Sequence, residues 1–345
     1  MPQKLTLPKI IIFLLLVIIV VLGYKNLTAK TDTNQVIIYV SHDQDYSEPI
    51  LKDFEAQTGI KVKAVYDTEA TKTTGLVNRL IAEKDNPQAD VFWNNEVSRT
   101  IVLKREGVLE PYISPNAADI PNLHKDAQGY WTGFAARARV LLVNTDLVEE
   151  APETLEELTD SQWKDNVTLA NPLFGTTASH ATALFVLWGD KKAEQYFADL
   201  KENGLVIAES NGQTRDMVAD SEIMVGFTDT DDANDAISDG KPVKVIYPDQ
   251  GKGQMGTLII PNSVMLVKDA SHPENAKKLI DYLLTPDVEE ALAFSKAAQM
   301  PLHPNVSRPE NVPDVSEIHA MSVSWEEVAE KLPAALEFLQ ELFLR

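Results

Sequence analysis

The stretch Val36-Ile37-Ile38-Tyr39-Val40 decides the fold, because an unbroken apolar run of this length is typical of a strand buried on both faces of a parallel sheet. The period then changes to that of a helix, with apolar residues at Tyr46, Ile50, Leu51 and Phe54. Gly59 ends this helix. A strand over 61–66, a helix over 75–83 and a short strand over 90–93 follow. The sequence therefore predicts a βαβαβ unit with right-handed crossovers, whose strand carboxyl ends face a crevice.

Further elements extend this pattern to the C-terminus. We expect strands over 140–144, 167–170, 224–228, 243–247 and 257–267, the last one around Pro261. We expect helices over 177–188, 191–203, 273–284 and 286–297. From Trp325 a last helix carries one apolar face, with Val328, Leu332, Leu336, Leu339 and Phe343. We expect it to pack on the body and to be kinked or split at Pro333; a partner-binding helix is the alternative.

The composition is that of a folded, water-soluble protein. The chain has 345 residues, 44% hydrophobic and 24% charged, which is enough for about two domains with sizeable cores. The absence of cysteine excludes disulfides, thiolate zinc sites, a cysteine nucleophile and a lipoprotein anchor. Acidic residues outnumber basic ones 52 to 31, for a formal net charge of -21. This charge repels nucleic-acid phosphates, so we expect no nucleic-acid partner.

The N-terminus carries an apolar run over 10–22, preceded by Lys4 and Lys9. A run of this length fits the core of a signal peptide better than a membrane span of about 20 residues. The cleavage site at Leu27-Thr28-Ala29 is imperfect, because only its last residue is small. Residues 1–29 are therefore a signal peptide or an uncleaved N-terminal anchor. In either case we expect export to the periplasm or to the outer face of the cytoplasmic membrane.

Common enzyme signatures are absent from the sequence. It contains no Gly-x-Ser-x-Gly elbow, no His-Glu-x-x-His, no P-loop, and no Gly-x-Gly-x-x-Gly after the first strand. The acidic run over 229–235 fails the calcium-loop template, because Ala233 takes a ligand position and no glycine follows. The six histidines show no paired ligand spacing. We therefore expect a protein that binds rather than catalyses.

Several fragments together carry a family resemblance that covers almost everything after residue 35. They are Val36-Ile37-Ile38-Tyr39, Ala89-Asp90-Val91-Phe92-Trp93 followed by Glu96, Gly107-Val108-Leu109-Glu110-Pro111-Tyr112, the strand over 137–145, and Asn275-Ala276-Lys277-Lys278. In this order and spacing they resemble the type 2 periplasmic solute-binding proteins of ABC importers, close to the ferric-ion-binding group. The resemblance implies two α/β lobes joined by crossing strands, with a ligand cleft between them. Lobe 1 then comprises 36–137 and 260–318, and lobe 2 comprises 138–259 and 319–345.

The resemblance also implies metal ligands, namely an acid and a histidine from one lobe and two tyrosines from the other, beside a synergistic anion. His42 and Asp43 match the histidine, and counting along the chain favours Asp43; Glu96 matches the acid. The alternative for Asp43 is a helix-capping acid, and for Glu96 an acid in the first turn of a helix.

The tyrosine pair of the family is missing, because Asp231 and Asp232 stand at the matching positions. A set of carboxylates suits a hard, oxygen-seeking metal or an organic cation rather than ferric iron alone. The alternative is that Thr230 or Asp229 caps a helix and that Asp231 and Asp232 are ordinary acids of its first turn.

The family's anion matches a helix start at Thr176 and Thr177, where free N–H groups and hydroxyls favour phosphate, carbonate or carboxylate; an ordinary cap is the alternative. Asn211 matches a second anion contact. Arg137 and Arg139 alternate along a crossing strand, so they point the same way, toward an anionic ligand or toward interior acids. Trp93 stacks on a flat ligand or belongs to the core.

The sequence thus predicts the exported, monomeric, non-catalytic subunit of an ABC importer, which delivers its solute to a membrane permease. The expected solute is iron(III) or a similar hard cation with a synergistic anion. One alternative is a small organic anion, such as a phosphonate or a phosphorylated sugar, held by Thr176, Thr177, Arg137 and Arg139. A remote alternative is a hydrolase that uses Asp43, Glu96 and Asp231 as paired carboxylates.

Overall fold

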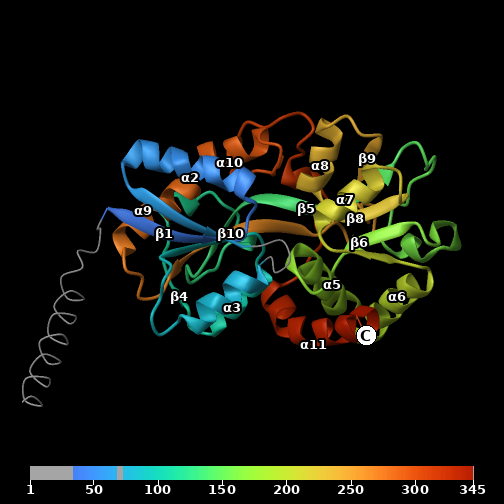
Figure 1. Ribbon diagram of the computed structural model, residues 1–345, viewed down its shortest axis with the longest axis horizontal. Helices are drawn as coiled ribbons and strands as arrows, with labels where there is room; N and C mark the ends of the chain where they lie inside the picture. The colour runs from blue at the N-terminus through green and yellow to red at the C-terminus, as the bar shows by residue number, and fades with distance from the viewer. Residues whose placement is uncertain (1–33, 68–72, 345) are drawn as a thin grey trace, which may run out of the picture.

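The structure, a computed structural model, describes residues 34–67 and 73–344 as two α/β lobes that lie side by side (Figure 1). The expected apolar run over 10–22 and the segment 1–29 lie outside the described residues. The strand order is β2-β1-β3-β10-β5-β8-β6-β7, with β4 on β10 and β9 on β5. The expected type 2 α/β fold is confirmed, because crossing strands join one half of this order to the other.

Lobe 1 is built on the stretch that opened the sequence. The strand β1 (Gln35–Val40) lies between its parallel neighbours β2 (Lys61–Tyr66) and β3 (Val91–Asn94). The strand β10 (Ile259–Val267) is antiparallel to β3 and carries the short β4 (Leu109–Glu110). The helices of this lobe are α2 (Gln44–Thr58), α3 (Thr74–Ala82), α4 (Ser98–Arg105), α9 (Pro273–Leu283) and α10 (Pro286–Phe294). Gly59 ends α2 at φ 70, as expected of a left-handed cap.

Lobe 2 repeats the same architecture. The strand β6 (Val167–Ala170) lies between its parallel neighbours β7 (Val206–Ala208) and β8 (Val225–Asp229). The strand β9 (Val243–Ile246) pairs antiparallel with β5. The helices are α5 (Gly175–Trp188), α6 (Asp190–Glu202), α7 (Asn211–Ala219) and α8 (Thr230–Ser238). Short 3-10 turns occur in the connections of both lobes at Pro115–Ala117, Asn122–His124, Glu156–Thr159, Ser161–Trp163 and Val315–Glu317.

The strand β5 (Thr132–Asn144) joins the two lobes and is longer than expected. Its first half pairs with β10 in the sheet of lobe 1, and its second half pairs with β8 and β9 in the sheet of lobe 2. The apolar pattern predicted 140–144 and the family resemblance extended the strand to 137–145, so residues 132–136 were missed, because they lack the apolar pattern of a strand. The register of β10 shifts between Pro261 and Asn262, next to this crossing.

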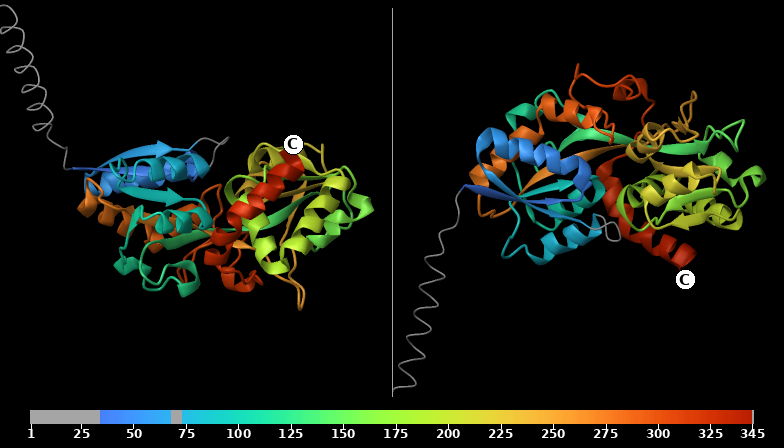
Figure 2. Two further views of the ribbon diagram at one scale, coloured as in Figure 1. Left: turned by 90° about the horizontal axis from the view of Figure 1, so that it is seen from below. Right: turned by 45° about the horizontal axis from the view of Figure 1, so that its top comes forward.

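The tail is one continuous helix, α11 (Trp325–Leu344), so of the two effects expected of Pro333 the split is wrong and the kink stays a prediction. Its buried face includes Val328, Leu332 and Leu339, and it packs against α5 and α6 of lobe 2 and against α4 of lobe 1. Figure 2 shows it in red, beginning near the junction of the lobes and running along lobe 2. Packing on both lobes outweighs the one backbone hydrogen bond that a proline removes. The expectation that the tail packs on the body is confirmed.

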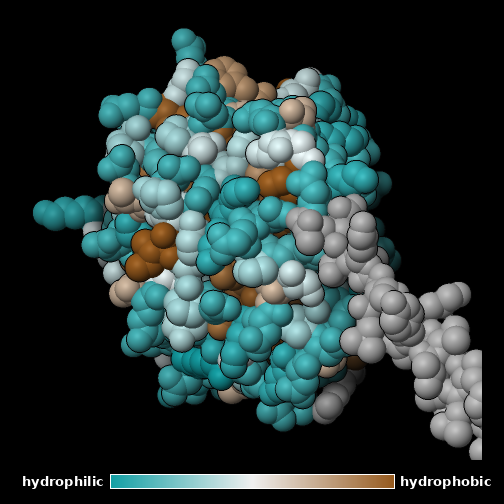
Figure 3. Space-filling model, turned by 90° about the vertical axis from the view of Figure 1, so that its left-hand side faces the viewer, coloured by the Kyte–Doolittle hydropathy of each residue, from teal (hydrophilic) through white to brown (hydrophobic). Residues whose placement is uncertain are grey.

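Glycine at position 226 of β8 lets α7 lie close to the sheet. A Cβ at Gly226 would lie 2.7 Å from Val218 Cγ2 and 2.9 Å from Thr214 Cγ2, both on α7. Figure 3 shows that the surface at the end of lobe 1 is mostly hydrophilic, with a few apolar residues scattered over it.

We expect Gly226→Ala to lower the free energy of unfolding by about 1–3 kcal/mol, because an added methyl overpacks this contact. Denaturant unfolding measures the change. Gly212→Ala is the matched control on α7, since its nearest atom lies 3.7 Å from the added Cβ and no loss is expected. Equal losses in both variants would show that the close packing of α7 is not the cause.

Candidate functional site

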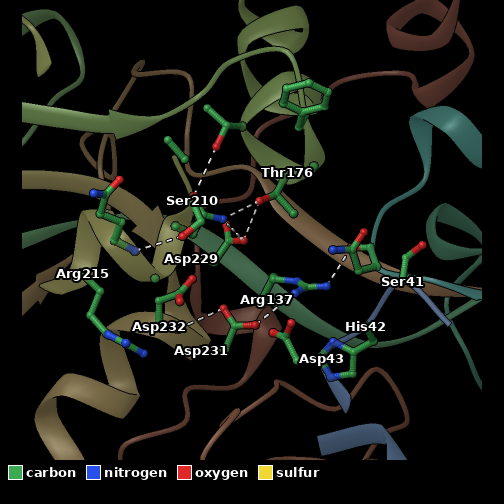
Figure 4. Close-up of a pocket in the computed structure, with 18 of the residues that line it drawn as sticks. Ser41, His42, Asp43, Arg137, Thr176, Ser210, Arg215, Asp229, Asp231 and Asp232 are labelled. Carbon is green, nitrogen blue, oxygen red and sulfur yellow. Dashed lines mark hydrogen bonds and ion pairs between the residues drawn. The ribbon is translucent and has the colours of Figure 1, made fainter. Parts of the chain in front are cut away.

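A cavity of about 780 Å³ opens between the lobes, and both lobes line it (Figure 4). Lobe 1 contributes the loop after β1, the start of α2 and the end of β2; lobe 2 contributes the starts of α5, α7 and α8. The cavity therefore lies at the carboxyl ends of strands from both lobes, as the fold predicts.

The wall of the cavity is strongly acidic. Among the residues that the structure describes, nine carboxylates line it, namely Asp43, Asp45, Asp67, Glu209, Asp216, Asp229, Asp231, Asp232 and Asp235. The two arginines of the wall, Arg137 and Arg215, already form ion pairs with acids of the same wall. The field inside the cavity is therefore negative and favours a positively charged group.

Asp43 lies at the position of the N-cap of α2, but its side chain forms no capping hydrogen bond. Its carboxylate lines the cavity instead, as does the neighbouring His42. The His42 ring is nearly buried and stacks on Trp93 with ring centroids 5.4 Å apart. Trp93 is fully buried against Phe134 and is not part of the cavity wall, which corresponds to the core alternative.

Glu96 lies away from the cavity wall and binds the lobes together beneath it. Its carboxylate accepts hydrogen bonds from Ser98 Oγ at 2.5 Å, from Ser179 Oγ at 2.9 Å and from the Arg99 backbone N–H at 3.0 Å. Ser98 belongs to α4 in lobe 1, and Ser179 belongs to α5 in lobe 2. Glu96 is fully buried and bonded to both lobes, so it forms an interlobe contact.

Three acids gather at the start of α8. Carboxylate oxygens of Asp229, Asp231 and Asp232 lie within 4.8 Å of one another. Asp229 is the residue at the N-cap but makes no capping bond, and the other two belong to the first turn. Asp231 Oδ2 accepts a hydrogen bond from Arg137 Nη1 at 3.0 Å, and both side chains are almost fully buried. Three close carboxylates of this kind are a donor set for a hard cation.

Both arginines of β5 bind interior acids of lobe 2. Besides Asp231, Arg137 donates to the carbonyl of Asn95 at 2.7 Å. Burial by itself lowers the pKa of Arg137, but the carboxylates of Asp231, Asp229 and Asp43 outweigh it, so that its pKa is raised. Arg139 is fully buried behind the wall and pairs with Asp229 at 2.7 Å.

The expected anion-contacting residues are brought together at the starts of α5 and α7. Thr176 Oγ1 donates to Asp229 Oδ2 at 2.6 Å, and Asn211 Nδ2 donates to the same oxygen at 3.0 Å. Thr177 Oγ1 donates to Asn211 Oδ1 at 3.2 Å. The helix α5 begins at Gly175, so both threonines lie within its first turn rather than before it. Their hydroxyls are directed at protein groups.

Sequence reasoning missed two tyrosines from lobe 1, Tyr46 and Tyr66, which line the cavity. Burial raises the pKa of Tyr46, and Asp231, Asp235 and Asp43 raise it further, so its phenol stays protonated at neutral pH. Burial raises the pKa of Tyr66 to about 12. Both residues lie next to strand carboxyl ends, and that position was the signal that could have identified them.

Comparison with known proteins identifies the family. A model described as bacterial extracellular solute-binding protein matches residues 50–320. The chain belongs to this family. It is 25% identical over 323 residues to Iron uptake protein A1 of Synechocystis sp., covering 90% of this chain and 87% of the relative. It is 29% identical over 258 residues to a putative 2-aminoethylphosphonate-binding periplasmic protein of Salmonella typhimurium, covering 72% of each chain.

The fold of this family member is also that of known structures. The structure of iron-bound HitA from Pseudomonas aeruginosa superimposes with a TM-score of 0.81 at 21% identity, covering 90% of this chain and 99% of the other. Within residues 34–67 and 73–344, no helix is both long and apolar enough to cross a membrane.

We expect Glu96→Gln to lower the free energy of unfolding by at least about 1.5–3 kcal/mol, because buried donors lose a charged acceptor. Asp43→Asn is the control, since Asp43 caps no helix and a smaller loss is expected. Thermal or urea unfolding of the two variants provides the comparison. If Asp43→Asn is the more destabilised, the roles given to these two acids are reversed.

Proposed function

We propose that this chain is the exported solute-capturing subunit of an ABC importer and that it delivers its solute unchanged to a membrane permease. Membership of the extracellular solute-binding family supports this role. The two-lobed fold with an acidic cavity at the junction supports capture by closure of the lobes on a solute. The N-terminal apolar run over 10–22 supports export, as a signal peptide or an anchor.

We infer that the solute is a hard cation, iron(III) or one like it. The single observation that carries this inference is the cluster of Asp229, Asp231 and Asp232, with carboxylate oxygens within 4.8 Å of one another in the acidic cavity. Arg137 and Arg139 each pair with one acid of this cluster, yet the three carboxylates still present closely spaced oxygen atoms, and hard cations prefer oxygen ligands. Asp43 of lobe 1 lies near Asp231 in Figure 4, so closure would add a ligand from the other lobe.

The names of similar proteins support iron as the solute. The carboxylates that stand in place of the family's tyrosines determine which atoms would bind it. The names of two similar proteins, Iron uptake protein A1 and iron-bound HitA, refer to iron. In this chain carboxylates stand where the resemblance implies lobe 2 tyrosines, and the phenol of Tyr46 in lobe 1 has a raised pKa. The proposed complex is therefore one of carboxylate oxygens, with His42 as an additional nitrogen donor close by.

A small organic anion is the second candidate. The starts of α5 and α7 line the cavity, and a volume of about 780 Å³ exceeds the needs of a bare ion. The name of the relative from Salmonella typhimurium refers to 2-aminoethylphosphonate. Such a ligand would take Thr176, Thr177 and the arginines of β5 as its donors. Turnover of any of these ligands would instead support the remote hydrolase alternative.

We expect Asp231→Asn to weaken binding of the cognate cation roughly tenfold to a hundredfold, because a bond to a charged group contributes about 1.5–3 kcal/mol. Calorimetric titration with ferric citrate, calcium and 2-aminoethylphosphonate compares wild type and variant. Asp220→Asn, an exposed acid of the same lobe, is the control and should bind as wild type does.

Two outcomes of that titration contradict the cation proposal. One is a variant that binds ferric ion as tightly as wild type while binding of the phosphonate changes. The other is an intense phenolate-to-iron absorption band in the ferric complex, which would show that a tyrosinate is a ligand. The carboxylate complex is expected to lack that band.

A further inference from the structure

Asp229 sits in a cradle of hydrogen-bond donors at the back of the cavity. Its Oδ2 accepts from Thr176 Oγ1 at 2.6 Å and from Asn211 Nδ2 at 3.0 Å. Its Oδ1 accepts from Arg139 Nη1 at 2.7 Å. These donors come from α5, α7 and β5, three elements that meet only in the folded lobe. A helix start, an amide and a guanidinium aimed at one point form a binding site for an anion.

This cradle is buried and its donors are already engaged. Asp229 and Thr176 are each 2% exposed, and Arg139 is 0% exposed. The guanidinium of Arg139 also lies 4.6 Å from the centre of the Phe227 ring, which separates it from water. A second anion at this place would have to displace Asp229 and would then lie beside three carboxylates, so its binding is opposed by charge repulsion.

The carboxylate of Asp229 has the advantage of being attached to the sheet. Asp229 is the last residue of β8, and its backbone is paired with that of Arg139 on β5. The strand pairing therefore holds the acid opposite the guanidinium before any ligand arrives. A tethered group of this kind has a high effective concentration, which a free anion must exceed to replace it.

We propose that Asp229 serves as a built-in anion: it fills the donor cradle, so the protein binds its cation without a co-bound anion and does not bind free phosphate or carboxylate there. The same carboxylate belongs to the cluster with Asp231 and Asp232, so its charge is presented to the cation from within the cradle. This proposal deepens the proposed function and rests on it for the cation; the cradle itself does not depend on the cation. It also counts against the second candidate, because the phosphonate would need the donors that Asp229 holds.

The first test uses anions alone. Purified wild-type protein, Asp229→Ala and the control Asp232→Ala are melted without metal in rising concentrations of acetate and of inorganic phosphate. We expect Asp229→Ala to be less stable than wild type, because Arg139 loses its partner, and to regain stability as the anion enters the vacated cradle. Wild type and Asp232→Ala should gain nothing, since in both Asp229 still fills the cradle. If Asp229→Ala folds only poorly, refolding with and without acetate gives the same comparison.

The second test uses the cation. Ferric or calcium affinity of wild type should be the same with and without added bicarbonate or phosphate, whereas Asp229→Ala should bind the cation roughly tenfold more tightly when the anion is present. The proposal is overturned if anions stabilise wild type as much as Asp229→Ala, if anions fail to rescue Asp229→Ala, or if wild type needs an added anion for cation binding. If anions rescue Asp229→Ala but wild type binds no cation, the claim that Asp229 fills the donor cradle is supported and the proposal that the solute is a cation is contradicted.

Discussion

Two buried arginines on the crossing strand β5 organise the rest of the site. Arg137 pairs with Asp231 and Arg139 pairs with Asp229, so the strand that joins the lobes also fixes the acids at the start of α8. Buried ion pairs contribute little net stability, but the loss of one partner leaves an uncompensated charge and is strongly destabilising. The pairs therefore act mainly as a constraint, which keeps two carboxylates oriented at the cavity.

The charge balance of the cavity follows from this constraint. In the described part of the wall, the arginines offset only part of the charge of the nine carboxylates, and those carboxylates are drawn from both lobes. A cation that enters the cavity can therefore join the lobes electrostatically, while Glu96 and Ser179 already connect them beneath it. Under the proposed function, the binding energy of a cation would in this way favour closure of the lobes.

Much of the fold could be predicted from the sequence, because long apolar patterns are local. The strand over 36–40 and the helix that ends at Gly59 are examples. The start of β5 over 132–136 could not be predicted, since its burial comes from the pairing with β10 rather than from its own residues. The continuity of α11 through Pro333 also depends on packing against distant helices.

The candidate site was only partly predictable for the same reason. Asp43, Asp231, Asp232, Thr176 and Asn211 were identified as candidates because they match ligand positions of the family that the sequence resembles, and all of them line the cavity. Glu96 also matches a ligand position of the family, but its carboxylate is bound by Ser179, 83 residues away, in a contact between the lobes. Asp229 was considered only as a cap, because nothing local indicates that Arg139, Thr176 and Asn211 converge on it.

The central claim is that the cavity selects a cation through carboxylates. Native mass spectrometry tests it most directly, after the protein has been equilibrated with an equal mixture of ferric citrate and 2-aminoethylphosphonate and then desalted. The account predicts a mass increase equal to one iron ion with no accompanying anion. A mass increase equal to the phosphonate, with or without metal, would contradict it.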